Sequence, residues 1–291
     1  MSSLVTCISC SQSIINTGDG SISLGRMMLT VSSGILMFNE RPSASMMLYF
    51  GPESYGLGQR LFIQKDDHVL DVCAGPGFQS LVAARNARHV TAVEVNPIAA
   101  GLLRLNTTLN ECANINVICS SFEDYEPECE FDLVVFNPPL LPVPTDLTYS
   151  LPGNGGVDGL EITRSILQHC QRWLSHNGRF QFVGHNYMSS ERGELLEDLA
   201  EATNNNFFVE LPIVSKTSSK RGSPAFENLV RSCLLYNQNK TYEEVARMIE
   251  EYAGKMGNPD IISYAACGYR SDEGGGRIVD YSKHDVGLWF V

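Results

Sequence analysis

The sequence predicts an α/β fold with a mostly parallel twisted sheet and helices on both faces, plus small N-terminal and C-terminal additions. Short apolar runs alternate with helical stretches from residue 68 to residue 214, which is typical of β-α-β units. Right-handed crossovers in such units place helices on both faces of the sheet. Ligands of these sheets bind outside the carboxyl ends of the strands, so the residues after each predicted strand form the candidate site.

The composition narrows the class of protein. Hydrophobic residues make up 43% of the 291 residues and charged residues 19%, which is typical of a globular chain. The net charge of −12 counts against a nucleic-acid partner, because basic residues that contact phosphates supply most of that affinity. No apolar run reaches the roughly 18 residues of a membrane span, and the first residues do not resemble a signal peptide.

The nine cysteines have no regular spacing that would indicate a disulfide framework. We therefore expect a reducing, cytoplasmic location away from membranes. Cys7 and Cys10 form a lone Cys-x-x-Cys pair, whereas a structural zinc site needs a second pair of ligands. The sequence thus predicts no metal site, and it leaves the oligomeric state open.

The predicted elements follow from local patterns. Apolar runs bounded by turn residues predict strands, and longer amphipathic stretches predict helices. The predicted strands are residues 68–73, 90–95, 115–119, 132–136, 179–184, 207–214 and 229–237. The predicted helices are residues 78–86, 97–110, 158–174 and 191–203.

Two additions flank this core. In residues 1–60, the apolar pieces 34–38 and 46–50 predict a loose hairpin that serves as a lid. After residue 240, residues 242–252 predict an amphipathic helix, and two strands joined by a Gly-Gly-Gly turn predict a hairpin. The expected segments are therefore a lid at 1–60, a catalytic domain at 61–240 and an appendage at 241–291.

The first predicted strand carries Asp71 and continues into a loop with Gly75 and Gly77. Glycines between a strand and a helix let a ligand approach the backbone closely. An acid on the strand would repel a pyrophosphate and would suit a cationic ligand group. The alternative is a tight turn in which glycine serves geometry alone.

The next two strands also end in polar residues. Glu94 lies 23 positions after Asp71, where an acid typically accepts hydrogen bonds from ribose hydroxyls. Ser121 and Phe122 follow the third strand and could border an adenine ring. The alternative for Ser121 is a helix N-cap, with Asp124 completing a capping box.

The turn after the fourth strand is Asn137-Pro138-Pro139. Two prolines stiffen the backbone and remove two N–H donors, so an adjacent carbonyl stays free to accept. Together with the amide oxygen of Asn137, it can hold an –NH₂ group by its hydrogens. The alternative is a proline-rich loop that only ends a strand.

These four motifs, in this order, resemble class I S-adenosylmethionine (SAM)-dependent methyltransferases of the Asn-Pro-Pro branch, which alkylate planar or exocyclic nitrogens. The Gly-Gly-Val-Asp-Gly-Leu stretch at 155–160, with Arg164, is similar to the glutamine N5-methyltransferases of release factors. The resemblance covers about residues 60–237 and implies a Rossmann-like fold with SAM as the cofactor. Leu140 departs from it, since an aromatic residue usually follows the two prolines.

The resemblance also implies roles for individual residues. The cofactor-binding residues would be Asp71, Cys73, Gly75, Gly77, Glu94, Ser121, Phe122 and Asn137. Cys73 stands where the family usually has its first loop glycine. Asn137 and Pro138 would hold the nucleophile and act in catalysis. Residues that could cover the site or contact substrate are Tyr55, Gln59, His185 and Tyr187.

The expected function is methyl transfer from SAM to a nitrogen of a small molecule, as in natural-product biosynthesis, or of an amide side chain. One alternative uses the aminocarboxypropyl group of SAM instead, for example in cyclisation to azetidine-2-carboxylate with release of methylthioadenosine. Another alternative is a SAM-binding protein without catalysis. The intact Asn-Pro-Pro turn argues against that last reading, because a pure binder does not need it.

Overall fold

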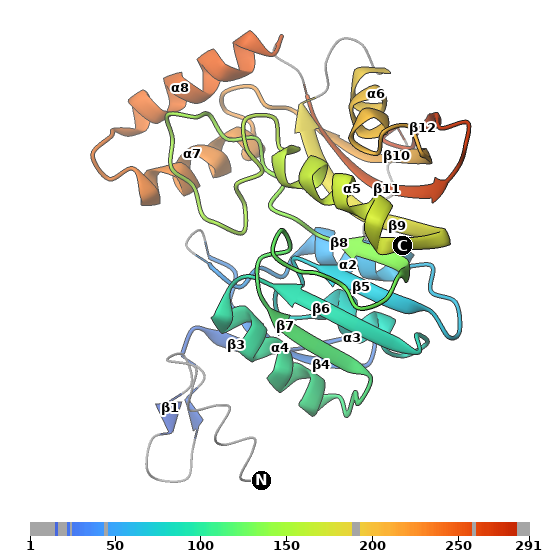
Figure 1. Cartoon of the computed structure of the whole chain (residues 1–291). Coiled ribbons are helices and arrows are strands. Elements are labelled where there is room, and N and C mark those ends of the chain that lie inside the picture. The colour runs from blue at the N-terminus through green and yellow to red at the C-terminus, as the bar shows by residue number, and fades with distance from the viewer. Residues whose placement is uncertain are drawn as a thin grey trace. The chain divides into compact units, whose positions relative to one another are not determined.

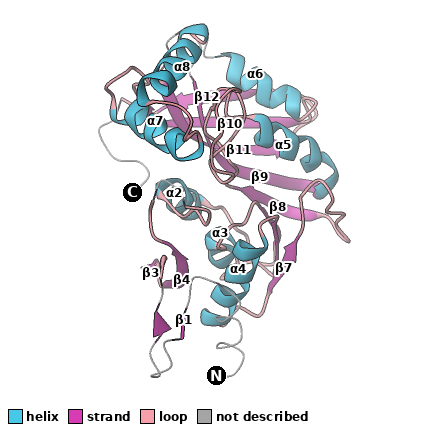
Figure 2. Ribbon diagram, turned by 90° about the vertical axis from the view of Figure 1, so that its left-hand side faces the viewer, coloured by secondary structure: helices cyan, strands magenta, loops and turns pink. Residues whose placement is uncertain are grey.

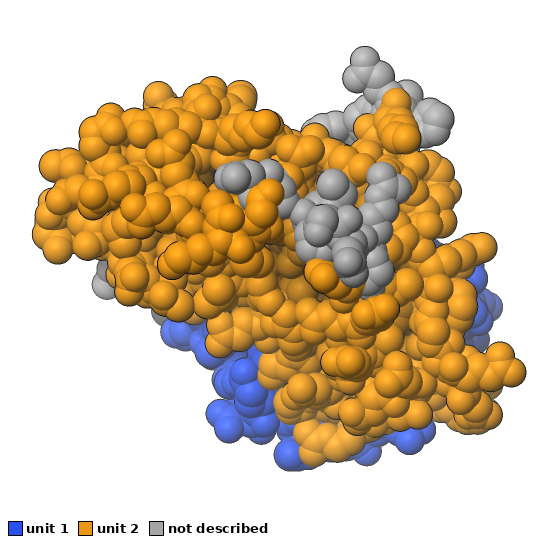
Figure 3. Space-filling model, turned by 90° about the horizontal axis from the view of Figure 1, so that it is seen from above, with its two compact units in different colours: residues 1–136 blue, residues 137–291 orange. Residues whose placement is uncertain are grey.

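The computed structural model describes residues 15–16, 22–23, 25–43, 46–187, 193–257 and 260–283. The chain divides into two compact units, residues 1–136 (unit 1) and residues 137–291 (unit 2), which are coloured separately in Figure 3. The segment boundaries expected at residues 60 and 240 stay predictions. The Cys7 and Cys10 pair lies outside the described residues.

Unit 1 contains four parallel strands in the order β8-β5-β6-β7. Their bounds are β5 His68–Val72, β6 His89–Glu94, β7 Ile115–Cys119 and β8 Phe131–Phe136. These lie within one residue of the predicted runs at each end. β5 is paired along both edges and is buried from Val69 to Val72, as expected for a central strand with a continuous apolar sequence.

Helices α2 (Pro52–Arg60), α3 (Phe78–Ala83) and α4 (Pro97–Leu109) complete the core of unit 1. The side chain of Asn96 caps α4 by accepting the Ile98 N–H at 3.0 Å, and a proline at the first helical position loses no hydrogen bond there. Figure 1 shows α4 running along β6 and β7.

The expected hairpin between residues 34–38 and 46–50 is wrong. The structure instead pairs β3 (Met27–Ser32) with β4 (Ile35–Glu40) in antiparallel fashion. Ser33 and Gly34 both have positive φ, which suits a two-residue hairpin turn. Residues 46–50 need no strand partner, because the Glu40 carboxylate accepts the N–H groups of Met47 and Leu48 at 2.7 and 3.1 Å. A second antiparallel pair is β1 (Ile15–Asn16) with β2 (Ile22–Ser23).

The part of unit 2 that the structure describes contains strands in the order β9-β11-β10-β12. Their bounds are β9 Leu174–Tyr187, β10 Phe207–Thr217, β11 Ile261–Arg270 and β12 Gly276–Asp280. β11 is antiparallel to both β9 and β10, and β12 is parallel to β10. The expected C-terminal hairpin is therefore wrong: β11 is buried along most of its length and pairs on both edges, so β12 joins the far edge of β10.

The described residues of unit 2 form four helices. They are α5 (Glu161–Trp173), α6 (Gly193–Ala202), α7 (Pro224–Tyr236) and α8 (Tyr242–Lys255). Figure 2 shows α5 and α6 against the strands of this unit, where α5 contacts β9 and α6 contacts β10 and β12. Among the described residues, no helix has both the length and the apolar character needed to cross a bilayer.

The expected strand at residues 229–237 is wrong, because this segment lies in helix α7. Ser223 caps the helix by accepting the Phe226 N–H at 3.3 Å, and Pro224 occupies the first turn. Phe226, Val230 and Cys233 recur at helical spacing and are buried in one cluster with residues of α8. The burial of this stripe against a second helix selects the helical conformation.

Replacing Phe226 with alanine should test this packing. Phe226 is 2% exposed, and removing a buried aromatic ring costs about 3–5 kcal/mol of unfolding free energy. Leu235 on the same helix is 43% exposed, so Leu235→Ala should cost less than ~1 kcal/mol. Urea unfolding followed by circular dichroism measures both, and equal losses would contradict the helical stripe.

Candidate cofactor and acceptor site

The strand register of unit 1 brings the predicted strand ends to one edge. Val72 of β5 is level with Val93 of β6 and with Phe136 of β8. Glu94 of β6 is level with Cys119 of β7. Since the strands are parallel, the residues that follow each of them emerge together. Asn137, the first residue of unit 2, follows β8 directly in the chain.

The loop after β5 has an unusual backbone. Cys73, Gly75 and Gly77 all have positive φ, at 57°, 54° and 96°. A Cβ at Gly77 would lie 2.6 Å from Leu103 Cγ, so glycine is required there for packing against α4. A Cβ at Gly75 would meet only the Tyr49 carbonyl oxygen, at 3.9 Å. The space in front of Gly75 is therefore open to a ligand.

Glu94 ties this loop to β6. Its carboxylate accepts the Gly75 N–H and the Asn96 N–H, both at 2.8 Å. The side chain is buried, and burial raises its pKa although the backbone hydrogen bonds oppose this shift. Each carboxylate oxygen can accept a further hydrogen bond, which fits ribose hydroxyls as ligands.

Asp71 lies inside unit 1 with 1% of its surface exposed. Its carboxylate accepts a hydrogen bond from the Ser80 hydroxyl at 2.6 Å. Burial raises the pKa of Asp71 to about 7, the Ser80 hydrogen bonds lower it, and the nearby Glu94 carboxylate raises it further. A buried acid next to a second acid is stabilised in its ionised form by a cationic group.

These features fit SAM, a ligand that carries an ammonium group, a sulfonium sulfur and ribose hydroxyls. Asp71 and Glu94 supply negative charge and acceptors, and Gly75 leaves its face open. The Cys73 thiol adds no charge, because burial raises its pKa well above the usual value and the carboxylates of Glu94 and Asp71 raise it further.

Ser121 precedes a bend at residues 122–124, and no helix begins there, so the alternative of a helix start is wrong. The Ser121 hydroxyl accepts the Glu123 N–H at 3.2 Å and donates to the Glu123 carboxylate. These two hydrogen bonds between Ser121 and Glu123 form a local serine turn, and the chain does not continue as a helix. Phe122 is 8% exposed, and its role beside an adenine stays a prediction.

The predicted lid residues fall in both units. In unit 1, the Tyr55 ring stacks on Phe78 with centroids 6.2 Å apart, and exposed Gln59 donates to the Ser33 hydroxyl at 2.7 Å. Both contacts tie α2 to its neighbours. Their roles toward a ligand stay predictions.

In unit 2, His185 and Tyr187 lie at the end of β9. The Nδ1 atom of His185 is 2.9 Å from the Ser263 hydroxyl on β11. The Tyr187 ring packs edge-on against Tyr252 of α8 at 5.8 Å, and burial raises the pKa of Tyr187 to about 12. Tyr187 thus stays protonated at neutral pH, and the substrate roles of both residues stay predictions.

Sequence reasoning missed Asn106, which supports the loop after β5. Its side-chain amide donates to the Pro76 carbonyl at 2.8 Å and to the Phe38 carbonyl at 2.9 Å, and its oxygen accepts the Phe38 N–H at 2.8 Å. Asn106 is fully buried on the apolar face of α4. A polar residue on an otherwise apolar helix face was the available signal.

Comparison with known proteins identifies the family. Residues 54–209 match the family described as methyltransferase small domain, which is more than half of the chain. The chain belongs to this family. The match confirms the class I methyltransferase resemblance and SAM as the cofactor of the family's fold.

A solved structure shares the fold. It is the structure of M. jannaschii TYW2 in complex with AdoMet, with a TM-score of 0.50 and 15% identity over 84% of this chain and 87% of that one. At this identity the likeness supports the fold alone, and it agrees with the predicted Rossmann-like architecture.

Two curated relatives carry names that state their substrates. The tRNA1(Val) (adenine(37)-N6)-methyltransferase of Aliivibrio fischeri is 33% identical over 44% of this chain and 56% of its own. The release factor glutamine methyltransferase of Mycolicibacterium smegmatis is 29% identical over 55% of this chain and 57% of its own. The chain thus spans little more than half the length of these relatives, so its own activity and substrates are proposals.

These names correct the expectation about partners. The expected partner was a small-molecule or amide substrate, and the net charge of −12 argued against nucleic acid. Relatives named for tRNA and for a release factor overturn the small-molecule expectation and the argument against nucleic acid, since both named substrates are macromolecules. The physical reason is that net charge sums the whole surface, whereas binding depends on the local potential around the site.

The buried Asp71 predicts a pH dependence of stability. Because its folded pKa of about 7 lies above the ordinary 3.8, the folded chain holds a proton that the unfolded chain has lost in this range. The contribution of this proton to the free energy of unfolding is complete below about pH 4. It is lost as the pH rises through about 7. Asp71→Asn should flatten this fall in the free energy of unfolding of the ligand-free protein.

The matched control is Asp66→Asn, which removes the same charge at an exposed position. Urea unfolding at a series of pH values gives the comparison. If Asp71→Asn and Asp66→Asn keep the same pH slope as the wild type, the elevated pKa of Asp71 is wrong.

Proposed function

We propose that the chain is a SAM-dependent N-methyltransferase whose acceptor is a planar –NH₂ group on a macromolecule, namely the glutamine side chain of a protein. The observation that carries this proposal is the Asn137-Pro138-Pro139 turn directly after β8, the strand paired in register with β5. The Gly-Gly-Val-Asp-Gly-Leu stretch at 155–160, similar to that of release-factor enzymes, favours glutamine as the acceptor.

On the acceptor side, the chain supplies two oxygens. The amide oxygen of Asn137 and the Pro138 carbonyl accept the two hydrogens of the –NH₂ group, which directs the nitrogen lone pair outward. The prolines have no N–H that would compete for these acceptors. As the nitrogen becomes positive during the reaction, the same oxygens stabilise that charge.

On the cofactor side, Asp71 would orient the ammonium group of SAM and Glu94 would accept hydrogen bonds from its ribose hydroxyls. Bound SAM supplies an electrophilic methyl carbon on a sulfonium sulfur. Transfer is an in-line displacement, so the protein contributes mainly by position and by exclusion of water. No base has to remove a proton before the bond forms: the nitrogen would take the methyl carbon, S-adenosylhomocysteine would leave with the electron pair of the broken S–C bond, and the methylated nitrogen would then release one proton to solvent.

A second candidate acceptor is an adenine amino group of tRNA. The relative that is 33% identical bears the name of a tRNA adenine-N6 methyltransferase, and adenine N6 is also a planar –NH₂ group. The same two oxygens would hold it. A tRNA acceptor predicts an activity that falls steeply with salt, since phosphate contacts release counterions.

The test separates the two acceptors. Purified protein is incubated with SAM and either a translation release factor or total cellular tRNA, and the products are resolved by mass spectrometry. S-adenosylhomocysteine together with a methylated glutamine supports the proposal. Methylated adenosine in the tRNA supports the second candidate. Methylthioadenosine from SAM alone, above its spontaneous decay, would overturn both, because the aminocarboxypropyl group would then be the one used.

Replacing Asn137 with alanine removes one of the two acceptor oxygens. With the accepted substrate, kcat should fall about 10²–10³-fold, while the Kd for SAM from calorimetry should change less than about twofold. Asn239→Ala, at an exposed position of the same unit, is the control and should leave both values unchanged. An unaltered kcat for Asn137→Ala would remove this residue from the mechanism.

A further inference from the structure

The chain just after the Asn-Pro-Pro turn is held by a glycine-rich loop of unit 2. The Leu141 N–H donates to the Gly153 carbonyl, the Gly155 N–H donates to the Leu141 carbonyl, and the Val143 N–H donates to the Gly156 carbonyl, each at 2.9 Å. These three bonds form a short ladder. The loop at residues 153–160, called the supporting loop below, thus fixes residues 141–143.

The supporting loop also packs against Leu140, the residue that directly follows the turn. A Cβ at Gly155 would lie 2.8 Å from Leu140 Cα, and a Cβ at Gly159 would lie 2.7 Å from the carbonyl oxygens of Leu140 and His185. Backbone therefore packs on backbone at both points. Because no side chain fits between, a shift of the loop is passed directly to Leu140, which follows the two prolines.

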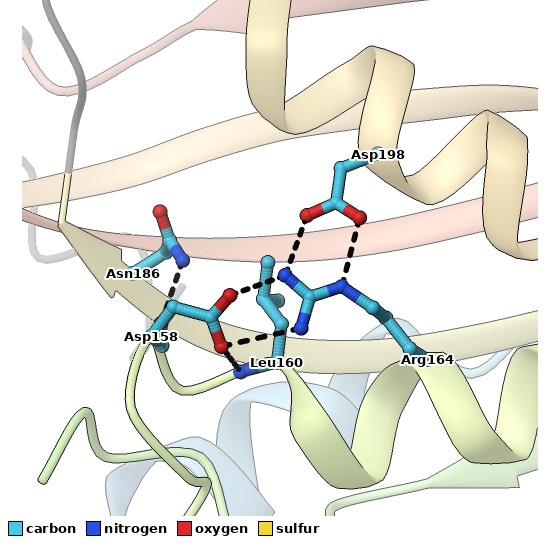
Figure 4. Close-up of polar contacts among 5 residues, drawn as sticks. All are labelled: Asp158, Leu160, Arg164, Asn186 and Asp198. Carbon is cyan, nitrogen blue, oxygen red and sulfur yellow. Dashed lines mark hydrogen bonds and ion pairs between the residues drawn. The ribbon is translucent and has the colours of Figure 1, made fainter.

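A charged cluster holds the other end of the supporting loop (Figure 4). The Arg164 guanidinium of α5 binds both oxygens of Asp198 on α6, with Nε and Nη2 at 2.8 and 2.7 Å. On its other side it donates to both oxygens of Asp158 in the loop, with Nη1 at 3.3 Å from Oδ1. Arg164 therefore joins the loop to two helices.

Asp158 makes further bonds that set the loop's direction. Its carboxylate accepts the Leu160 N–H at 3.0 Å, and its backbone carbonyl accepts from the side-chain amide of Asn186 on β9 at 2.7 Å. Burial raises the pKa of Asp158, but the hydrogen bonds from Arg164 and the Leu160 N–H and the positive charge of Arg164 together lower it by more, so the pKa lies below its usual value. The carboxylate stays ionised and paired at neutral pH.

The exposure of the cluster argues against a purely stabilising role. The side chains of Arg164, Asp158 and Asp198 are 30%, 27% and 33% exposed. Ion pairs that are open to water contribute little to stability. A forked guanidinium between two carboxylates is, however, strongly directional, which suits a role in fixing geometry.

We propose that Arg164, Asp158 and Asp198 are positioning residues for the Asn-Pro-Pro turn. They orient the supporting loop, and the loop holds residues 140–143 so that the acceptor oxygens of Asn137 and Pro138 keep a fixed direction. The expected effect on turnover rests on the proposed function. The expected effect on the hydrogen-bond ladder does not, because it concerns only the contacts between residues 141–143 and the supporting loop.

The test replaces Arg164 with lysine, which keeps the positive charge but cannot bind a carboxylate through two parallel N–H groups. Hydrogen exchange should become at least about tenfold faster in the peptides that contain the Leu141, Val143 and Gly155 amides, because the ladder opens locally. With substrate, kcat should fall about 10–100-fold from a small misplacement, while the Kd for SAM should stay within about twofold.

Arg221→Lys is the matched control. Arg221 also pairs with two carboxylates, Glu243 and Glu250 of α8, in the same unit. It should leave exchange in the ladder and kcat unchanged. If Arg164→Lys does not fold, Asp198→Asn removes one side of the fork in its place.

Two results would overturn the proposal. One is wild-type exchange in the ladder of a folded Arg164→Lys or Asp198→Asn protein. The other is faster ladder exchange with an unchanged kcat, since the loop would then not position the turn. The exchange measurement needs neither cofactor nor acceptor. If the wild-type protein transfers no methyl group, the proposed function fails, while exchange still decides whether the cluster holds the ladder.

Discussion

The parallel register of β5 with β6 and β8 is the constraint on which the candidate site depends. It sets Val72 level with Val93 and Phe136, so the chain leaves all three strands at one edge. A slip of one residue would turn each side chain to the opposite face. Asp71 would then point away from Ser80, and Glu94 would no longer reach the Gly75 N–H. The positions of the side chains in the candidate site thus depend on the backbone pairing of these strands.

The two charged regions of the molecule differ in how their charges are balanced. Asp71 and Glu94 are both buried and both have raised pKa values, so this edge of unit 1 holds acids without an equal positive charge among their described contacts. Such an arrangement costs stability and is typical of binding sites. The Arg164 cluster of unit 2 is instead paired by hydrogen bonds on both sides. The first region suits a ligand, and the second suits the support of a backbone.

The strands and the strand-end residues of unit 1 could be predicted, because central parallel strands are short apolar runs that end at polar or glycine residues. The sequence pattern that indicates a helix at α7 was weaker than the patterns of the unit 1 strands. Its stretch from Leu229 to Tyr236 is largely apolar, so a strand and a buried helix look alike over that length. The stronger evidence was the cap at Ser223 and Pro224, upstream of the apolar stretch.

Other features depend on contacts that are remote in sequence. The place of β12 beside β10 follows from the burial of β11 between two strands. Asn106 reaches Phe38 across 68 positions, which no local pattern records. The acceptor class also depends on local surface shape and charge, and the net charge of the chain misjudged it.

Asn106 links two parts of unit 1 through a single side chain. One amide group holds the Phe38 backbone of the β3–β4 hairpin and the Pro76 carbonyl of the loop beside the candidate cofactor site. By thermodynamic linkage, a ligand that holds this loop also raises the free energy needed to detach the hairpin. The reverse follows with equal size: a partner that binds the detached or the packed hairpin preferentially changes the affinity of the loop for its ligand. The hairpin is therefore a place from which occupancy of the site can be sensed or adjusted.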